Sequence, residues 1–312
     1  MFTKIRLLCL TGYFLPAIHL APCISAADNA SVVPKHFARN NLVAWCIVPF
    51  DTKRRNPEER AAMLEKLGFK HFAYDWRTEH IPTFDAEIKA LTKHGITLDA
   101  FWFPATLDDD ARKILEALKR NKIKTHLWVT MPDPGPEAKT QKEKVEAAVK
   151  VLRPLAEEAE KIGCTIGLYN HGGWFGDPEN QIAMIEHSKL KNVGIVYSQH
   201  HGHDQIDRFP DLLKKMKPYL VCLNLNGMVK DGDKQGKKIL PLGQGDLDVT
   251  LLKAIKDSGY EGLIGIIGHT QDDAEERLKD NLDGLDWLLP QVNGKAAGPR
   301  PKLRTALAPA KK

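Results

Sequence analysis

Cysteine is scarce in this sequence: five occur among 312 residues, and no two of them form a CxxC pair. A zinc ribbon and a dense disulfide framework are therefore excluded. Aromatic residues make up only 7% of the chain, and the mean hydropathy of −0.34 excludes a polytopic membrane protein. An excess of one charge is also missing, because 45 Lys and Arg against 40 Asp and Glu leave a net charge of +5. So small an excess does not indicate a nucleic-acid-binding surface.

The remaining composition is that of a globular protein. Hydrophobic residues make up 43% of the chain and charged residues 27%. These proportions allow a full core and exclude a disordered chain. A chain of this length holds either one large barrel or two ordinary domains.

The N-terminal segment has the pattern of a secretory signal peptide. The basic residues Lys4 and Arg6 precede an apolar run over residues 7–24, and small residues follow at 25–27. This order predicts a signal peptide over residues 1–27 that is cleaved after its last residue.

Two alternatives to a cleaved signal are weaker. Pro16, His19 and Pro22 interrupt the apolar run, which disfavours a membrane anchor. Residues 20–23 read LAPC and resemble a lipobox, but proline directly before the cysteine is a poor match. We therefore expect a secreted or periplasmic protein with no membrane partner after cleavage, in which residues 28–39 form a linker.

Cleavage would leave three cysteines in the mature chain. Cys46, Cys164 and Cys222 each lie in an apolar run typical of a strand. An odd number in such positions predicts small buried residues rather than disulfide bonds.

Eight short runs of strand character follow the linker, and most are separated by helical stretches. The expected strands are 42–48, 69–74, 97–103, 123–129, 164–169, 193–198, 219–225 and 262–267. Their continuous apolar character is typical of strands that are covered on both faces of a parallel sheet. Apolar residues at three- and four-residue spacing predict helices over 57–67, 110–120 and 139–162.

This alternation predicts a single-domain (β/α)8 TIM barrel over residues 40–292, since such barrels typically span about 250 residues. The alternative is an open doubly wound sheet, which usually has a glycine-rich turn after its first strand. Residues 49–55 instead read PFDTKRR. Residues 293–312 are rich in Ala, Pro, Lys and Gly, and we expect them to form a disordered basic tail.

Polar residues are concentrated where the expected strands end, which is where barrel enzymes carry their catalytic groups. The catalytic candidates are Asp75, His80, His171 and His201. The substrate-binding candidates are Arg77, Glu79, Trp102, Asn170, Trp174, Asn224 and Asn226. The metal-ligand candidates are His171, His201, His203 and His269.

Each group also has a simpler interpretation. Asp75 and Arg77 are two residues apart on a strand and thus on the same side, so they could form a structural ion pair. Residues 200–203 read HHGH and could be a solvated loop, although three histidines in four residues suit metal binding or acid–base chemistry. Trp102 could be a core residue, although aromatic faces beside Asn and His also hold sugars.

The second half of the sequence resembles the xylose-isomerase-like barrels, a superfamily of sugar-phosphate isomerases and epimerases that includes endonuclease IV-type repair enzymes. The motifs that carry the resemblance are NHGGW (170–174), GIVYSQHHGH (194–203), LNLNG (223–227), PLGQGDLD (241–248) and GYEGLIGII (259–267). The resemblance implies a TIM barrel over about residues 40–290 and chemistry on sugars.

The resemblance also implies one divalent cation, but most of its ligands are missing. The family's first Glu, its Asp, its strand-seven His and its last Glu correspond here to Tyr169, Ser198, Asn224 and either Ile267 or Gly268, in that order. Of the ligands, only the strand-six His is kept, as His201. A Mg²⁺ or Mn²⁺ site depends on carboxylate oxygens. The family's usual site is therefore not carried over, and a softer transition metal held by histidines, or no metal, are the two alternatives.

The leading hypothesis is an exported isomerase, epimerase or lyase that moves a proton beside the carbonyl of a carbohydrate or keto-sugar. His171 or His201 would take the proton, while Asn170, Asn224 and Asn226 would bind the enolate. The alternative is a barrel that binds sugar without turnover. An abasic-site endonuclease is disfavoured by the missing carboxylates and the modest charge, so a small carbohydrate rather than nucleic acid is the expected partner. No oligomeric state is indicated.

Overall fold

A computed structural model of the chain describes Met1 and residues 34–305. The signal peptide expected over residues 1–27 and most of the linker lie outside the described residues. Within residues 34–305, no helix combines the length and the apolar character needed to cross a membrane.

Eight parallel strands form one closed barrel, in which β8 pairs with β1. They are β1 Leu42–Trp45, β2 His71–Tyr74, β3 Thr97–Phe103, β4 His126–Val129, β5 Thr165–Tyr169, β6 Val193–Ser198, β7 Leu220–Leu225 and β8 Leu263–Ile267. Consecutive strands are neighbours throughout, with register shifts between β2 and β3 and between β6 and β7. The predicted (β/α)8 fold is confirmed, and each strand lies within the range expected for it.

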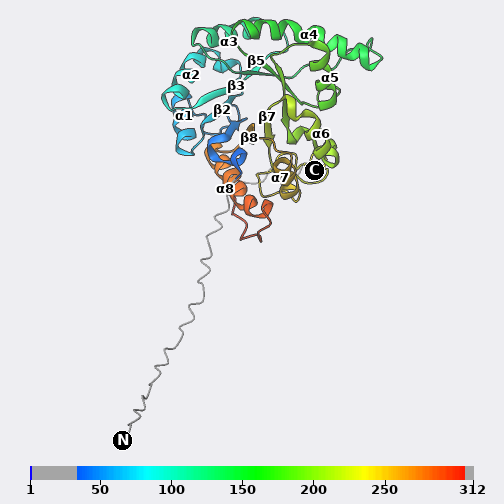
Figure 1. Cartoon of the computed structure of the whole chain (residues 1–312). Helices are drawn as coiled ribbons and strands as arrows, with labels where there is room; N and C mark the ends of the chain where they lie inside the picture. The colour runs from blue at the N-terminus through cyan, green and yellow to red at the C-terminus, as the bar shows by residue number, and fades with distance from the viewer. Residues whose placement is uncertain (2–33, 306–312) are drawn as a thin grey trace. The chain divides into compact units, whose positions relative to one another are not determined.

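The helices surround the strands, as Figure 1 shows. They are α1 Pro57–Lys66, α2 Phe84–Lys93, α3 Asp109–Arg120, α4 Gln141–Lys161, α5 Pro178–Ser188, α6 Phe209–Met216, α7 Asp248–Asp257 and α8 Ala274–Val292. Local sequence sets several of their starts. Asn56 caps α1 in a reciprocal capping box with Glu59, and Thr140 caps α4 in the same way with Glu143.

Aromatic side chains fill the inside of the barrel. Trp45, Trp128 and Tyr169 are almost fully buried there, together with small residues such as Ala73 and Ala100. The Trp45 and Trp128 rings meet edge to face with centroids 4.7 Å apart. Cys46, Cys164 and Cys222 are buried and free, as the sequence predicts.

A buried ion pair joins the first two helices. Arg60 on α1 donates from Nε and Nη2 to the two carboxylate oxygens of Glu87 on α2, each at 3.0 Å. The Glu87 side chain is fully buried and that of Arg60 is 4% exposed. The two-point geometry satisfies both charges where water does not reach them.

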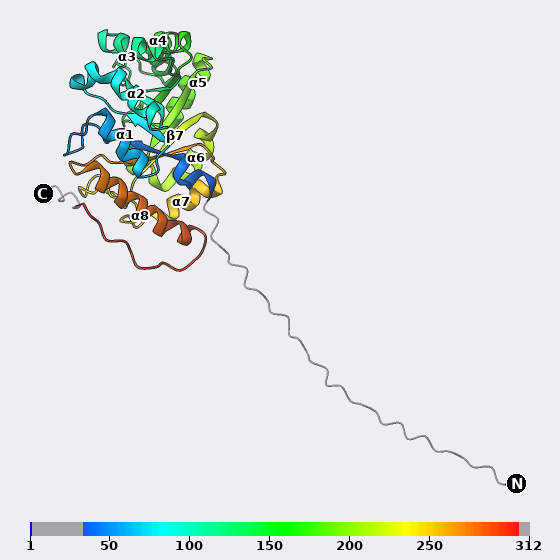
Figure 2. The ribbon, with the colours of Figure 1, turned by 90° about the vertical axis from the view of Figure 1, so that its left-hand side faces the viewer.

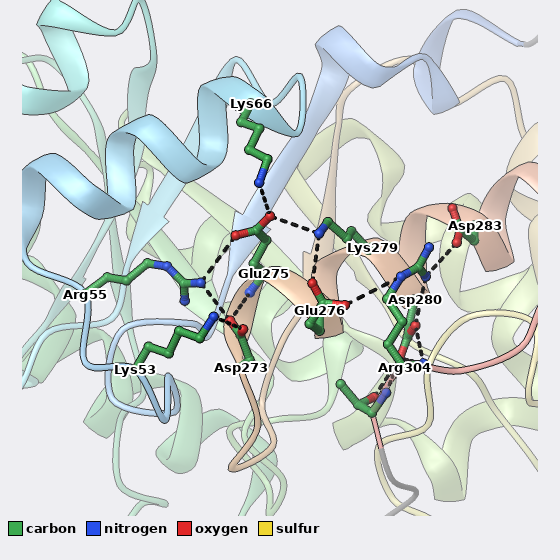
Figure 3. Close-up of polar contacts among 11 residues, drawn as sticks. Lys53, Arg55, Lys66, Asp273, Glu275, Glu276, Lys279, Asp280, Asp283 and Arg304 are labelled. Carbon is green, nitrogen blue, oxygen red and sulfur yellow. Dashed lines mark hydrogen bonds and ion pairs between the residues drawn. The ribbon is translucent and has the colours of Figure 1, made fainter.

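The segment after α8 lies along that helix as far as Thr305 (Figure 2). The Arg304 guanidinium contacts Asp280, Asp283 and Glu276 on α8, and the backbone N–H of Arg304 donates to Asp280 at 2.9 Å (Figure 3). Composition alone indicates a disordered tail from residue 293, and it misses this attachment because one arginine supplies most of it. Residues 306–312 lie outside the described residues.

Candidate active site

A cavity of about 500 Å³ opens at the carboxyl ends of the strands. Its lining contains Trp45, Cys46, Phe50, Asp75, Trp76, Arg77, Thr78, Trp102, Pro104, Tyr169, His171, His200, His201, Lys238, Ile239 and His269. These residues come from the ends of seven different strands or the loops after them, since β4 contributes none. The position and the mixture of aromatic walls with a few convergent polar groups are those of a barrel active site.

Asp75 is the one carboxylate in this lining. It follows β2 directly and is 2% exposed. Its Oδ1 accepts from the backbone N–H of Val48 at 3.2 Å, while Oδ2 is buried and has no hydrogen-bond partner among the described residues. Burial raises the pKa of Asp75 from its ordinary value of 3.8 to about 7. A carboxyl with this pKa both takes and returns protons near neutral pH.

The remaining residues after β2 divide between the cavity and the surface. Arg77 lines the cavity, whereas His80 and Glu79 do not. The Nδ1 atom of His80 accepts from the backbone N–H of Arg77 at 2.8 Å, so this histidine supports the loop. The predictions of His80 as a catalytic residue and of Glu79 as a substrate ligand therefore find no support in the geometry.

Four histidines lie together on one side of the cavity. The centroid distances are 3.8 Å from His200 to His201, 4.4 Å from His171 to His201 and 6.0 Å from His200 to His269. His171, His201 and His269 are predicted site residues, whereas His200 is not, although the HHGH motif contains it. Ser198 Oγ holds Nδ1 of His200 at 2.9 Å.

These histidines are held in the neutral form. Burial, and after it the neighbouring His171, lowers the pKa of His201 to about 2. Burial together with Lys238 and Arg77 lowers the pKa of His269 to about 4. The pKa values of His171 and His200 are lowered too, chiefly by burial. A histidine with so low a pKa is a weak base, and the assignment of His201 as the group that takes the proton stays a prediction.

The expected histidine metal site does not assemble. Nε2 of His203 faces the carbonyl oxygen of Lys238 at 3.0 Å, away from the cavity lining. Between residues 34 and 305, no three His, Cys, Asp or Glu side chains are grouped so that they could hold a metal ion.

The family's metal position does not fit a cation either. By the resemblance, Tyr169 corresponds to the first Glu, and its hydroxyl accepts from Nε1 of Trp45 at 3.3 Å. Burial raises the Tyr169 pKa far above its ordinary value, so the phenol offers no anionic oxygen. Asn224, in the place of the strand-seven His, has its Oδ1 beside the Cys222 thiol at 3.5 Å. Neutral side chains thus replace the carboxylates that a hard cation needs.

The three asparagines predicted to bind substrate are buried inside the protein, outside the cavity lining. Asn170 joins β5 to β6 by donating to the Ser198 carbonyl at 3.1 Å and accepting from the Ser198 N–H at 2.7 Å. Nδ2 of Asn226 donates to the carbonyls of Gly227 at 2.9 Å and Lys238 at 3.3 Å. Asn170 and Asn226 therefore fix strand ends and loops, because their amides satisfy buried backbone groups, whereas Nδ2 of Asn224 is buried with no hydrogen-bond partner among the described residues.

Only one of the two residues predicted to stack on the sugar lines the cavity. Trp102 lines the cavity and lies 5.9 Å from Trp45, centroid to centroid. Trp174 lies outside the lining, where its Nε1 donates to Gln141 at 3.0 Å. Asp133 accepts from the Trp174 N–H at 3.0 Å, which fixes the turn after β5 and holds the indole at the surface of α4.

Sequence reasoning missed several cavity residues. Phe50, Trp76 and Tyr169 supply aromatic wall, and Lys238 supplies a cation from the loop between β7 and α7. Tyr169 ends an expected strand, and Phe50 and Trp76 each come two residues after one, so their positions were a usable signal. Lys238 carried no such signal, because it lies among several lysines of a long loop.

Comparisons with known proteins agree with this architecture. The 3-keto-D-glucoside 4-epimerase of E. coli is 17% identical, with a TM-score of 0.58 over 80% of this chain and 98% of that one. D-Psicose 3-epimerase of Clostridium cellulolyticum, solved with D-tagatose, is 16% identical, with a TM-score of 0.54 over 80% and 98%. AP endonuclease family 2 from Brucella melitensis is 15% identical, with a TM-score of 0.56 over 77% and 97%.

At such identities these likenesses show the fold alone. No curated protein matches the sequence significantly. The family model described as xylose isomerase-like TIM barrel matches residues 61–290, which is most of the chain. The chain belongs to the xylose isomerase-like TIM barrel family.

Proposed function

We propose that this protein isomerises or epimerises a carbohydrate by moving a proton beside a carbonyl group. The observation that carries the proposal is Asp75, a buried cavity carboxyl with a pKa of about 7 and one oxygen that has no hydrogen-bond partner among the described residues. The sugar epimerases among the similar folds support the substrate class.

In this reaction the ionised Asp75 takes the proton from the carbon next to the carbonyl. The C–H electrons form an enediolate, and the former carbonyl carries the negative charge. A neutral histidine N–H, from His171 or His201, donates to that oxygen and stabilises it. The hydroxyl proton on the neighbouring carbon's oxygen moves to the former carbonyl oxygen, and the protonated Asp75 gives its proton to the former carbonyl carbon, so that the neighbouring carbon becomes the new carbonyl. Aromatic faces such as Trp102 contact the C–H side of the sugar.

A single carboxyl favours isomerisation over epimerisation within this proposal. One base takes and returns the proton on the same face of the enediolate, which moves it between neighbouring carbons. Inversion at one carbon needs an acid on the opposite face, and the histidines with lowered pKa are poor candidates for that role.

A panel of aldoses and ketoses, followed by NMR, tests the proposal. We expect Asp75→Asn to lower turnover by about 10²–10⁴-fold, the usual contribution of a general base. Glu79→Gln is the matched control, because Glu79 is exposed and outside the cavity lining. Sugar binding without turnover across the panel would support the alternative of a non-catalytic carbohydrate-binding barrel.

We also propose that the enzyme acts outside the cytoplasm. The basic residues Lys4 and Arg6 and the apolar run over residues 7–24 support this proposal. Mass spectrometry of the protein from its native host should find a mature N-terminus at Asp28. A mature chain that begins at Met1 would contradict it.

A further inference from the structure

Two cations reach the cavity without an acidic partner. Arg77 and Lys238 both line it, and neither forms an ion pair with any acidic residue that the structure describes. Other lysines of the same loop differ, since Lys230 pairs with Asp207 and Lys234 with Asp231 at 2.7 Å. Lys237 of this loop likewise forms no ion pair with a described acidic residue but lies outside the lining, so Lys238 is distinguished by its place in the cavity.

Backbone carbonyls hold Arg77 in place while its charge stays uncompensated. Its Nη1 donates to the carbonyl oxygens of Asp75 at 3.0 Å and of Trp76 at 2.7 Å. The guanidinium carbon also lies 5.8 Å from the centre of the Phe50 ring. Bonds to neutral carbonyls orient a guanidinium and leave its remaining N–H groups available for an anion.

The backbone of Lys238 is held from two sides. Its carbonyl oxygen faces Nε2 of His203 at 3.0 Å and accepts from Nδ2 of Asn226 at 3.3 Å. These contacts give a role to two buried residues that do not line the cavity. They fix the loop at the point where the lysine side chain enters the site.

The charges of both cations act on His269, and that of Lys238 acts on His171, His200 and His201 as well. Each of the two cations lowers the pKa of His269 by its charge. Phe50 connects the group, because its ring lies 3.9 Å from the His269 ring and also contacts Arg77. A neutral histidine that lines the cavity with two cations adds a hydrogen-bond donor without an opposing charge.

We propose that Arg77 and Lys238, together with His269, bind an anionic group of the substrate, a carboxylate or a phosphate. This inference rests on the proposed function and specifies its substrate class: a sugar acid or a sugar phosphate rather than a neutral sugar. The anion would lie beside Phe50 and orient the carbonyl end of the sugar toward Asp75. Two cations that each donate a hydrogen bond to the same anion bind it strongly, because both bonds are charge-assisted.

The first test uses inorganic phosphate and acetate as probes, with binding followed by NMR of the histidine side chains. We expect saturable binding that shifts the His269 signals. Arg77→Met and Lys238→Met should each weaken it by about tenfold or more. Lys230→Met is the matched control, because Lys230 belongs to the same loop, is paired and lies outside the lining. No saturable binding of either probe, or binding that neither variant changes, would overturn the inference.

The second test compares D-glucose 6-phosphate, D-glucuronate and D-glucose as ligands. A preference for the phosphate or for the carboxylate that is lost in Arg77→Met identifies which anion the site takes. Turnover of neutral sugars with no preference for anions would overturn this inference and leave the proposed function intact. Anion binding without any turnover would overturn the proposed function and leave this inference intact.

Discussion

Arg77 donates to the main-chain carbonyl of Asp75, at 3.0 Å, and not to its carboxylate. The two side chains are neighbours on the strand end but do not form the ion pair that their spacing allows. Two consequences follow. The Asp75 carboxyl, without a salt bridge, keeps the raised pKa of about 7 that burial gives it. The guanidinium charge stays available to a ligand.

The first prediction concerns the pH dependence of catalysis. Asp75 acts as a base only when it is ionised, and its pKa is about 7. We expect kcat/KM to rise with pH through about 7 and then to level off. A steady-state pH profile of wild type checks this, and a profile that is flat between pH 5 and 9 or that falls through this range would contradict it.

The second prediction concerns stability and the same carboxyl. Because the Asp75 pKa is higher in the folded than in the unfolded chain, the folded state binds more protons between about pH 4 and 7. The contribution of Asp75 to stability should therefore fall as pH rises through this window and stay constant above it, while the lowered pKa values of His201 and His269 give a contribution of the opposite sign below about pH 6.5. Asp75→Asn should remove the cost of ionising this buried carboxyl, and so raise the free energy of unfolding at pH 8 by roughly 1–4 kcal/mol.

Urea unfolding of both proteins at pH 5 and pH 8 checks this prediction. Burial also raises the pKa of Asp248 to about 7, so part of the slope should persist in the variant. The informative quantity is therefore the difference between the two proteins. An equal loss of stability in both would contradict the assignment of a raised pKa to Asp75.

The third prediction concerns the buried pair between α1 and α2. Glu87→Ala leaves the Arg60 guanidinium buried without its partner, and its cost should be about 3–5 kcal/mol. Thermal unfolding measures this loss. Glu58→Ala is the control, because Glu58 pairs with Lys93 at the exposed surface of the same two helices and its removal should cost much less stability than removal of the buried Glu87. Equal losses in the two variants would contradict the account of the buried pair.

The fourth prediction concerns the segment attached to α8. The Asp280 side chain is fully buried and accepts from the backbone N–H groups of Arg304 and Thr305. Asp280→Ala should cost about 1–3 kcal/mol by leaving these donors without partners, and it should release the segment. Hydrogen exchange of residues 296–305 would then accelerate. The control Asp283→Ala removes one exposed contact and should leave exchange nearly unchanged.

The barrel was predictable because its signal is repeated along the chain. Strands such as 97–103 and 193–198 are continuous apolar runs, and their bounds agree with the structure residue for residue. The attachment after α8 was not predictable, since Arg304 finds its acidic partners only once the helix is folded.

The site was predictable in part, for a physical reason. Strand ends converge in any such barrel, so Asp75, Arg77 and the histidines were found from position alone. Side-chain direction decides the rest. Asn170 and Asn226 turn to backbone groups, and Lys238 reaches the cavity from a loop whose course no periodicity encodes.

Loss of the hydrogen at the carbon beside the carbonyl tests the central claim most directly. An aldose or ketose that turns over, labelled with deuterium at that carbon, is incubated with wild type, Asp75→Asn and Glu79→Gln, and release of the label to water is followed by NMR. The account predicts release by wild type and Glu79→Gln, and a rate about 10²–10⁴-fold lower in Asp75→Asn. Release by Asp75→Asn at the wild-type rate would contradict it.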